Sequence, residues 1–158
     1  MIIKYQPIGF VRSQYQTTKG TPIQPSRARG VEGTIEIEET YVEALSDLDG
    51  FSHIIVIVHL HKASEFRLKV VPYLDTEVRG LFATRAPSRP NPIGISLVRL
   101  LSIDGRRLRI EGVDLLDGTP VLDIKPYVRD FDEQTEVRCG WLDKIRAGDV
   151  VADDRFER

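Results

Sequence analysis

Residues 94–113 read Gly-Ile-Ser-Leu-Val-Arg-Leu-Leu-Ser-Ile-Asp-Gly-Arg-Arg-Leu-Arg-Ile-Glu-Gly-Val. The pair Asp104-Gly105 divides this stretch, and apolar and polar side chains alternate around it. An Asp-Gly pair between alternating runs is the strongest short-range signal of a β-hairpin. The sequence therefore predicts two antiparallel strands, Gly94–Ile103 and Arg106–Val113.

Three arginines of this hairpin would share its outer face, namely Arg99, Arg107 and Arg109. They could form a basic patch that attracts an anion. The alternative is an ordinary solvated face, which is the more common role of exposed arginines. The sequence alone leaves both interpretations open.

Short β-type segments continue on both sides of the hairpin. Val31–Glu39 alternates apolar and acidic residues, which indicates a strand with one wet face. Phe51–Leu60 is a dense β-branched run, typical of a buried central strand. Shorter strands are expected at Tyr5–Val11, Leu81–Thr84 and Val121–Lys125, and helices at Thr40–Leu48 and Glu133–Ile145.

The predicted elements amount to roughly seven or eight short strands, little helix, and turn signals every ~8–12 residues. This pattern is typical of an antiparallel barrel or sandwich. The sequence has no βαβ rhythm and no glycine-rich nucleotide fingerprint or Walker loop. The predicted fold is mainly β: a small antiparallel β-barrel with short helices, not Rossmann-like.

Length and composition are those of an ordinary soluble domain. The chain has 158 residues, of which 41% are hydrophobic and 29% charged. We expect one domain over residues 1–158, with a core at about 5–128 and an acidic C-terminal tail at about 129–158. The net charge of -2 argues against indiscriminate nucleic-acid binding. A local basic face on the body of the domain remains compatible with it.

Targeting and redox signals are weak. No apolar run reaches the ~18 residues of a membrane span, and the N-terminus lacks the apolar core of a signal peptide. The single cysteine, Cys139, fits a reducing compartment and excludes a cysteine-rich zinc site. We therefore expect a cytoplasmic protein without a membrane segment.

Arg85–Gly94 reads Arg-Ala-Pro-Ser-Arg-Pro-Asn-Pro-Ile-Gly. Each proline fixes its own φ and holds the residue before it extended. The segment is therefore predicted to be a stiff loop whose backbone is set before a ligand arrives. Its two arginines, Arg85 and Arg89, would make a preorganised anion clamp. The alternative is a rigid connector between two strands.

Two further polar regions suggest ligand contacts. Ser13–Gly30 is a long polar loop, and such loops in compact domains are often functional. Asp123 and Lys125 lie on one face of a predicted strand, so they must be paired or must face a cleft.

Three histidines accompany the predicted central strand: His53, His59 and His61. They share parity on that strand and would face one side of it. We expect no metal there, because no acidic residue or cysteine lies at a matching short spacing. His61, at the end of the strand, is the histidine most suited to meet a ligand.

Several segments resemble the TsaA-like (YaeB-like, TrmO) family. The match rests on Arg89-Pro90-Asn91-Pro92-Ile93-Gly94 and on Asp117-Gly118-Thr119-Pro120-Val121-Leu122-Asp123-Ile124-Lys125-Pro126-Tyr127. Phe82-Ala83-Thr84-Arg85, Phe51-Ser52-His53 and Ile8-Gly9-Phe10-Val11-Arg12-Ser13 support it. The resemblance covers about residues 5–128. Many bacterial relatives carry a further C-terminal domain, whereas this sequence continues only as a short acidic tail.

The resemblance implies a mainly β barrel that acts as a homodimer. It implies transfer of a methyl group from S-adenosylmethionine to N6 of threonylcarbamoyladenosine 37, in the anticodon loop of tRNA. It places the cofactor against Ile23, Gln24, Pro25, His61, Lys62, Arg85, Ile95, Glu111, Gly112, Val113 and Asp114.

The same resemblance places Asn91, Asp123, Lys125 and Tyr127 nearest the reacting adenine, as the catalytic group. Asp123 or Asn91 would accept the N6 proton. Lys125 and Arg89 would hold substrate anions, which makes Arg89 a substrate-binding residue, and Tyr127 would stack on a base. Arg85 would hold the cofactor carboxylate or a substrate phosphate.

Two alternatives stay open at this point. The barrel could be a non-catalytic module that binds S-adenosylmethionine or RNA, or a methyltransferase for a different substrate, since function resides in sites rather than folds. The Asp123, Lys125 and Tyr127 group favours the enzyme, because a sensor would not need those residues beside its ligand.

Overall fold

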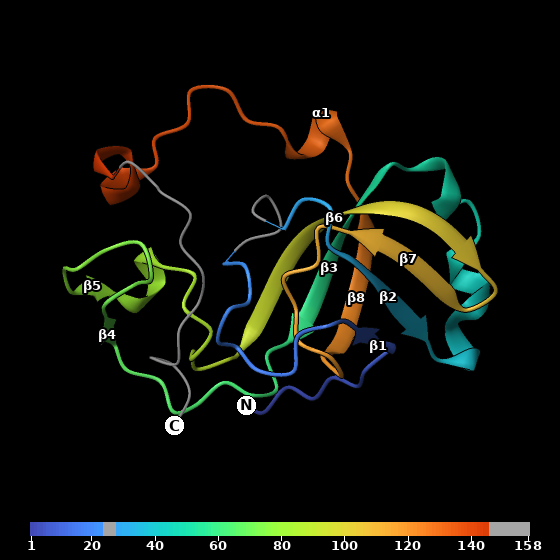
Figure 1. Cartoon of the computed structure of the whole chain (residues 1–158), viewed down its shortest axis with the longest axis horizontal. Coiled ribbons are helices and arrows are strands. Elements are labelled where there is room, and N and C mark those ends of the chain that lie inside the picture. Colours follow the sequence, from blue (N-terminus) through green and yellow to red (C-terminus); the bar gives the residue numbers. More distant parts are fainter. Residues whose placement is uncertain (24–27, 146–158) are drawn as a thin grey trace.

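The computed structural model describes residues 1–23 and 28–145, and its centre is a closed antiparallel barrel of six strands. The strand order is β1-β2-β7-β6-β3-β8, and the barrel occupies the right half of Figure 1. The strands are β1 Gly9–Arg12, β2 Glu32–Ile37, β3 His53–His59, β6 Ile93–Asp104, β7 Arg107–Glu111 and β8 Pro120–Pro126. The mainly β barrel predicted from the sequence is confirmed.

The decisive hairpin forms as predicted. β6 and β7 pair from Asp104↔Arg107 at the turn to Arg99↔Glu111 at the far end. Gly105 in the turn has φ +57, a conformation that glycine adopts without steric cost. A bulge between Leu100 and Ser102 shifts the register. Bulges bend the strand that carries them, and β6 is long enough to pair with β7 at one end and β3 at the other.

The arginines of the hairpin are paired with glutamates of neighbouring strands. Arg99 lies 3.5 Å from Glu111, and Arg109 lies 2.8 Å from Glu32. Arg107 lies 3.5 Å from Glu36. The solvated-face interpretation therefore describes Arg107 and Arg109, whereas Arg99 and Glu111 also line a cavity described below.

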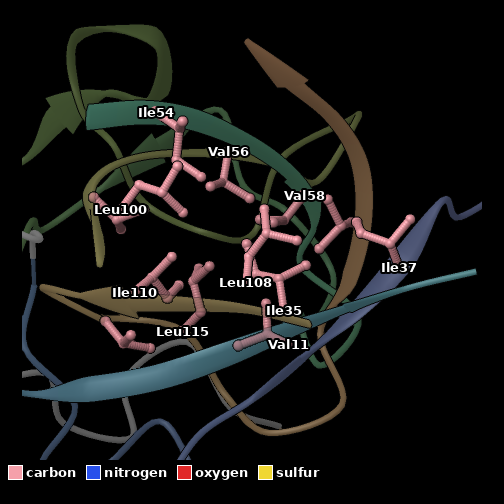
Figure 2. Close-up of a cluster of buried hydrophobic side chains, with 13 residues drawn as sticks. Val11, Ile35, Ile37, Ile54, Val56, Val58, Leu100, Leu108, Ile110 and Leu115 are labelled. Atoms are coloured by element: carbon pink, nitrogen blue, oxygen red, sulfur yellow. The ribbon is translucent and has the colours of Figure 1, made fainter. Parts of the chain in front are cut away.

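Alternate side chains of the strands fill the barrel (Figure 2). On β3, Ile54, Val56 and Val58 are fully buried while the residues between them face outward. Their facing partners come from β1, β2, β6 and β7 and include Val11, Ile35, Ile37, Leu100, Leu108 and Ile110. Each such side chain contributes about 1.5–3 kcal/mol of burial free energy, so this core fixes which strand residues point outward to the sites described below.

A small arm projects from the barrel on the left of Figure 1. It consists of β4 Lys69–Val70, β5 Arg79–Gly80 and the 3-10 helix η4 Leu81–Ala83, with Leu81 and Ala86 buried in its own small core. The predicted strand Leu81–Thr84 is therefore wrong. Thr84 donates from both its backbone N and its Oγ1 to the carbonyl of Leu81, which closes a tight helical turn.

The predicted helices also differ from the structure. Thr40–Leu48 is helical only as two 3-10 segments, η2 Glu39–Leu45 and η3 Leu48–Gly50, separated around Asp47 with φ +66. Glu133–Ile145 is not one helix. The chain forms two short elements instead, α1 Arg129–Asp132 and η5 Gly140–Lys144. Glu136, between them, has φ +54, and Gly140, the first residue of η5, has φ +60. Both values lie outside the right-handed helical region.

The remaining boundaries follow from local chemistry. The first strand begins at Gly9 rather than Tyr5, after Pro7, which has no N–H for a ladder bond. Gly9 itself is packed so closely against β2 that a side chain there would clash with the carbonyl of Glu36. Among the described residues, no helix is long and apolar enough to cross a membrane.

Candidate functional site

A cavity of about 870 Å³ lies between the barrel and the arm. Its size falls within the range of small-molecule sites. The chain that leaves β3 and the start of β6 supply one wall, and the loop before β6 and the loop before β8 supply the next ones. The arm and the segment around η5 complete it, so the lining comes from parts of the chain far apart in sequence.

The predicted stiff loop forms one side of this cavity and is held by internal hydrogen bonds. Ser88 is 2% exposed and its hydroxyl lies 3.0 Å from that of Ser64. Nη1 of Arg89 donates to the carbonyls of Thr84 at 2.9 Å and Ala86 at 3.3 Å. The loop conformation is therefore fixed by the protein itself, as the proline spacing predicts.

The two arginines of the loop differ in what holds them. Arg89 braces the loop through its carbonyl bonds, and its Cζ lies 5.6 Å from the centre of the Phe82 ring. Arg85 lines the cavity, and its positive charge acts on the carboxylate of Asp114. Both arginines of the predicted anion clamp therefore lie at the cavity, and the charge of Arg85 acts on its carboxyl group.

Among the described residues that line the cavity, Asp114 is the acidic one. Burial raises its pKa to about 7, while the hydroxyl of Ser96, 2.7 Å from Oδ1, and the charge of Arg85 act in the opposite direction. Near neutral pH the carboxyl group therefore exists in both protonation states. A carboxyl tuned in this way can accept or return a proton at physiological pH.

His61 and Lys62 lie across the cavity on the chain leaving β3. Burial lowers the pKa of His61, and the charges of Lys62 and His59 lower it further. His61 is therefore neutral at physiological pH and can both donate and accept a hydrogen bond. The ammonium of Lys62 donates to the carbonyl of Gln16 at 2.7 Å, which ties the long Ser13–Gly30 loop to this wall.

A second cavity, of about 730 Å³, adjoins the first and shares Arg85 and Ile95 with it. Its lining includes Glu111, Gly112 and Tyr127. The Tyr127 ring packs edge-on against His53, with centroids 6.5 Å apart.

The structure brings most of the predicted cofactor residues together. Those lining the larger cavity are Ile23, His61, Lys62, Arg85, Ile95 and Asp114, together with the predicted substrate residue Arg89. Glu111 and Gly112 line the adjoining cavity with Tyr127. Val113 is fully buried in the barrel core. Gln24 and Pro25 lie outside the described residues.

Three of the predicted catalytic residues lie apart from both cavities. Asn91 is exposed in the loop, and Asp123 and Lys125 are on the outward face of β8, opposite Ile57 and Ile55 of β3. Nζ of Lys125 lies 2.8 Å from Oδ2 of Asp123, and this hydrogen bond raises the pKa of Lys125. Of the two possibilities predicted for this pair, mutual pairing is the one observed.

The residues of the larger cavity that sequence reasoning missed include Ser96, Phe82 and Trp141. Ser96 lies at a buried position of β6, between Gly94 and Val98. The alternation of buried and exposed residues along the strand predicts an apolar residue there. That mismatch was a usable signal. For Trp141 the only signal was a single tryptophan in a polar tail.

The histidines do not converge on a metal. Within residues 1–23 and 28–145 there is no group of three or more His, Cys, Asp or Glu side chains arranged to hold a metal ion. His53 and His59 lie at the two ends of β3, and His61 lies in the cavity.

Comparisons with known proteins agree with this architecture. The sequence profile of the tRNA-methyltransferase O N-terminal domain matches residues 10–133. A probable S-adenosyl-L-methionine-binding protein of Pyrococcus abyssi is 54% identical over 144 residues, which is 91% of this chain and 78% of that protein. The tRNA (adenine(37)-N6)-methyltransferase of Mus musculus is 37% identical over 134 residues, or 80% of this chain and 31% of that protein.

A solved structure shares the fold. The crystal structure of TrmO from Pseudomonas aeruginosa superimposes with a TM-score of 0.75 at 41% sequence identity. The superposition covers 89% of this chain and 63% of that one. The chain therefore spans less than two thirds of this solved relative.

Proposed function

The chain belongs to the family of the tRNA-methyltransferase O N-terminal domain, and from this premise we propose that it is an S-adenosylmethionine-dependent tRNA methyltransferase. The proposed acceptor is N6 of adenine 37, in its threonylcarbamoyl form, in the anticodon loop. Support comes from relatives named for the cofactor and for the adenine-37 reaction. The observation that carries the proposal is the cavity in which Arg85, His61 and Asp114 meet.

The residues of the cavity suit the cofactor. Its volume of about 870 Å³ accommodates a ligand of that size, with Ile23, Ile95 and Leu115 as apolar lining. The guanidinium of Arg85 suits a carboxylate, which it can bind with two parallel hydrogen bonds. The neutral imidazole of His61 suits polar groups of the ligand, because it adds no positive charge beside a sulfonium.

When bound, the cofactor supplies an electrophilic methyl group on its sulfonium. The protein must hold the acceptor nitrogen in line with that group, which is catalysis by positioning. N6 must also lose a proton, and the carboxyl group of Asp114 is the cavity's acceptor with a pKa near the working pH. Ser96 orients this carboxyl group through Oδ1. We therefore assign the acceptor role to Asp114 in preference to Asp123 or Asn91, which lie outside the cavity.

A homodimer is part of the proposal. β6 presents Ile93, Ile95 and Leu97 on its outer face, with 45%, 55% and 43% of each residue exposed. Ile55 and Ile57 of β3 lie beside Leu97 and Ile95. A contiguous apolar strip on an outer sheet face favours burial against another surface. A second copy seated there would cover Ile95, which lines both cavities, so it would lie against the wall of the site.

The test is transfer of a labelled methyl group from the cofactor to threonylcarbamoylated tRNA. We expect label in the wild-type reaction at adenine 37 and none when the tRNA lacks the threonylcarbamoyl group. Absence of transfer under conditions in which the Pseudomonas aeruginosa relative is active would overturn the proposal. Analytical ultracentrifugation across a concentration series tests the dimer, and a monomer at all concentrations contradicts it.

A binding-only role is the second candidate, favoured by the cofactor-binding name of the Pyrococcus abyssi relative. Cofactor affinity together with zero turnover in the presence of tRNA would support it. Both the methyltransferase role and the binding-only role involve tRNA or S-adenosylmethionine. We propose a cytoplasmic location on that ground.

A further inference from the structure

The arm end of the larger cavity is aromatic. It is lined by Phe82 of η4 and by Trp141 and Leu142 of η5. Residues 134–145 lie beyond the stretch that matches the family profile, which ends at residue 133. In Figure 1 this segment, drawn in orange to red, leaves the barrel at α1 and crosses to the arm. It therefore adds to the cavity a wall that the profile does not include.

Trp141 is held firmly against the arm. Its indole Nε1–H donates to the carbonyl of Ala83 at 2.8 Å. The Cζ atom of Arg79 lies 5.4 Å from the centre of the indole ring, a cation–π distance. The guanidinium of Arg79 is fixed in turn by Asp75 at 2.7 Å and Glu77 at 2.9 Å. The position of the ring is thus set by the arm before any ligand binds.

Phe82 is adjacent to the carbonyl that anchors Trp141, and it is 77% exposed. Its ring does have one companion, the guanidinium of Arg89 at 5.6 Å. Arg89 cannot swing away freely, because Nη1 is bonded to the carbonyls of Thr84 and Ala86. The result is a large exposed aromatic side chain, with a fixed guanidinium beside it, at the entrance to a ligand cavity.

We propose that Phe82, Arg89 and Trp141 form a stacking subsite for an unpaired base of single-stranded RNA next to the reacting nucleotide. Exposed aromatic rings combined with guanidinium groups are the surfaces on which proteins stack bases of single-stranded RNA. Lys62 lines the same cavity and supplies positive charge for an adjoining phosphate. The inference rests on the proposed function, since it assumes an RNA acceptor. It also moves base stacking from Tyr127, which lies in the adjoining cavity, to the arm.

The sequence offers a direct probe, because Trp141 is the only tryptophan of the chain. Its fluorescence therefore reports on this subsite alone. We expect addition of an anticodon-loop RNA to quench the emission and to protect it from acrylamide. A fully duplexed RNA of the same length should leave the emission unchanged, since its bases are not available for stacking.

The matched variants are Phe82→Ala and Phe131→Ala. Phe131 of α1 is 78% exposed, close to the 77% of Phe82, but it is not among the cavity residues. Stacking contributes about 1–3 kcal/mol per base, so we expect Phe82→Ala to raise the KM for RNA about tenfold. The KM for the cofactor and the rate at saturating RNA should stay unchanged. Phe131→Ala should behave as wild type, and thermal unfolding will show that both variants are folded.

The outcomes separate the two proposals. An unchanged KM for RNA in Phe82→Ala, with methyl transfer intact, overturns the subsite and leaves the proposed function standing. RNA-dependent quenching that Phe82→Ala weakens, without methyl transfer, overturns the function and supports the subsite. Emission that changes with protein concentration but not with RNA shows that a second copy occupies the surface, and it overturns the subsite.

Discussion

Two arginine-rich regions of this chain differ in what lies opposite each guanidinium. On the outer face of the β6–β7 hairpin, Arg107 and Arg109 each lie across from a glutamate of a neighbouring strand. In the proline-rich loop, Arg89 is bonded to backbone carbonyls and Arg85 lines a cavity that also contains Asp114. The number of arginines is therefore a poor guide to an anion site. Whether the guanidinium lines a cavity or lies on an open surface beside a carboxylate is the more useful distinction.

The same contrast applies to the carboxylates. Glu32 and Glu36 of β2 pair with arginines of the hairpin, and exposed ion pairs are worth about 0–1 kcal/mol. Asp114 is enclosed in the cavity wall, and burial is the main cause of its raised pKa. Burial of the carboxyl group, rather than the number of charges, distinguishes the cavity from the hairpin surface.

Replacing the cavity carboxylate should have the largest effect. In the wild type we expect kcat/KM to rise as the pH passes about 7, the pKa of Asp114, because the ionised form accepts the proton. Asp114→Asn should remove this limb of the profile and lower the rate at pH 8 about 100-fold, the usual size of a general-base effect. The measurement is methyl transfer from pH 5.5 to 8.5. A variant that keeps the same pH profile would assign the proton to another group.

Removing the cavity arginine should come next. Arg85→Ala should weaken cofactor binding about tenfold, since a charged hydrogen bond contributes about 1.5–3 kcal/mol. Isothermal titration calorimetry measures the change directly. Arg109→Ala is the control from the hairpin, and it should bind the cofactor as wild type does. Equal losses in both variants would show that the general positive charge of the surface matters, rather than the site.

Ser96→Ala should shift the pH profile without abolishing activity. The hydroxyl bond to Oδ1 favours the charged form of Asp114, so its loss should raise the pKa further and move the rising limb to higher pH. An unchanged midpoint would mean that Ser96 does not act through Asp114.

Stability should reveal the same titration by an independent route. The folded-state pKa of about 7 exceeds the ordinary value, so the folded protein keeps a proton that the unfolded chain has lost. The contribution of Asp114 to stability should therefore fall as the pH rises from about 4 to about 7 and should level off above that. Urea unfolding at several pH values should show a smaller decline in Asp114→Asn. An identical decline in both proteins would contradict the raised pKa.

Local signals in the sequence predicted the parts of the fold that depend on local chemistry. Asp104-Gly105 fixed the hairpin turn, the β-branched run at Phe51–Leu60 became β3, and the prolines made Arg85–Pro92 an irregular loop. The predicted helix Glu133–Ile145 failed because apolar spacing does not reveal positive φ at Glu136 and Gly140.

The cavity could be predicted only in part, since it depends on contacts between distant segments. The family resemblance pointed to Arg85, His61 and Asp114, and all three line the cavity. The bond between Ser96 and Asp114 depends on how the loop after β7 returns to β6, and the contact of Trp141 with Ala83 joins residues 58 positions apart. Long-range pairings of this kind leave no local pattern in one sequence.

The smallest expected effect belongs to the hairpin surface, where Arg109 and Glu32 lie 2.8 Å apart with both side chains more than half exposed. Arg109→Ala should lower the free energy of unfolding by less than about 1 kcal/mol, because exposed ion pairs are screened by water and salt. Urea unfolding of Arg109→Ala, Glu32→Ala and the double variant measures the coupling, which should shrink further at 1 M salt, where the screening length falls to about 3 Å. A coupling well above this size would mean that the pair organises the β2–β7 register. The contrast between a structural arginine surface and a ligand-binding one would then rest on cofactor binding alone.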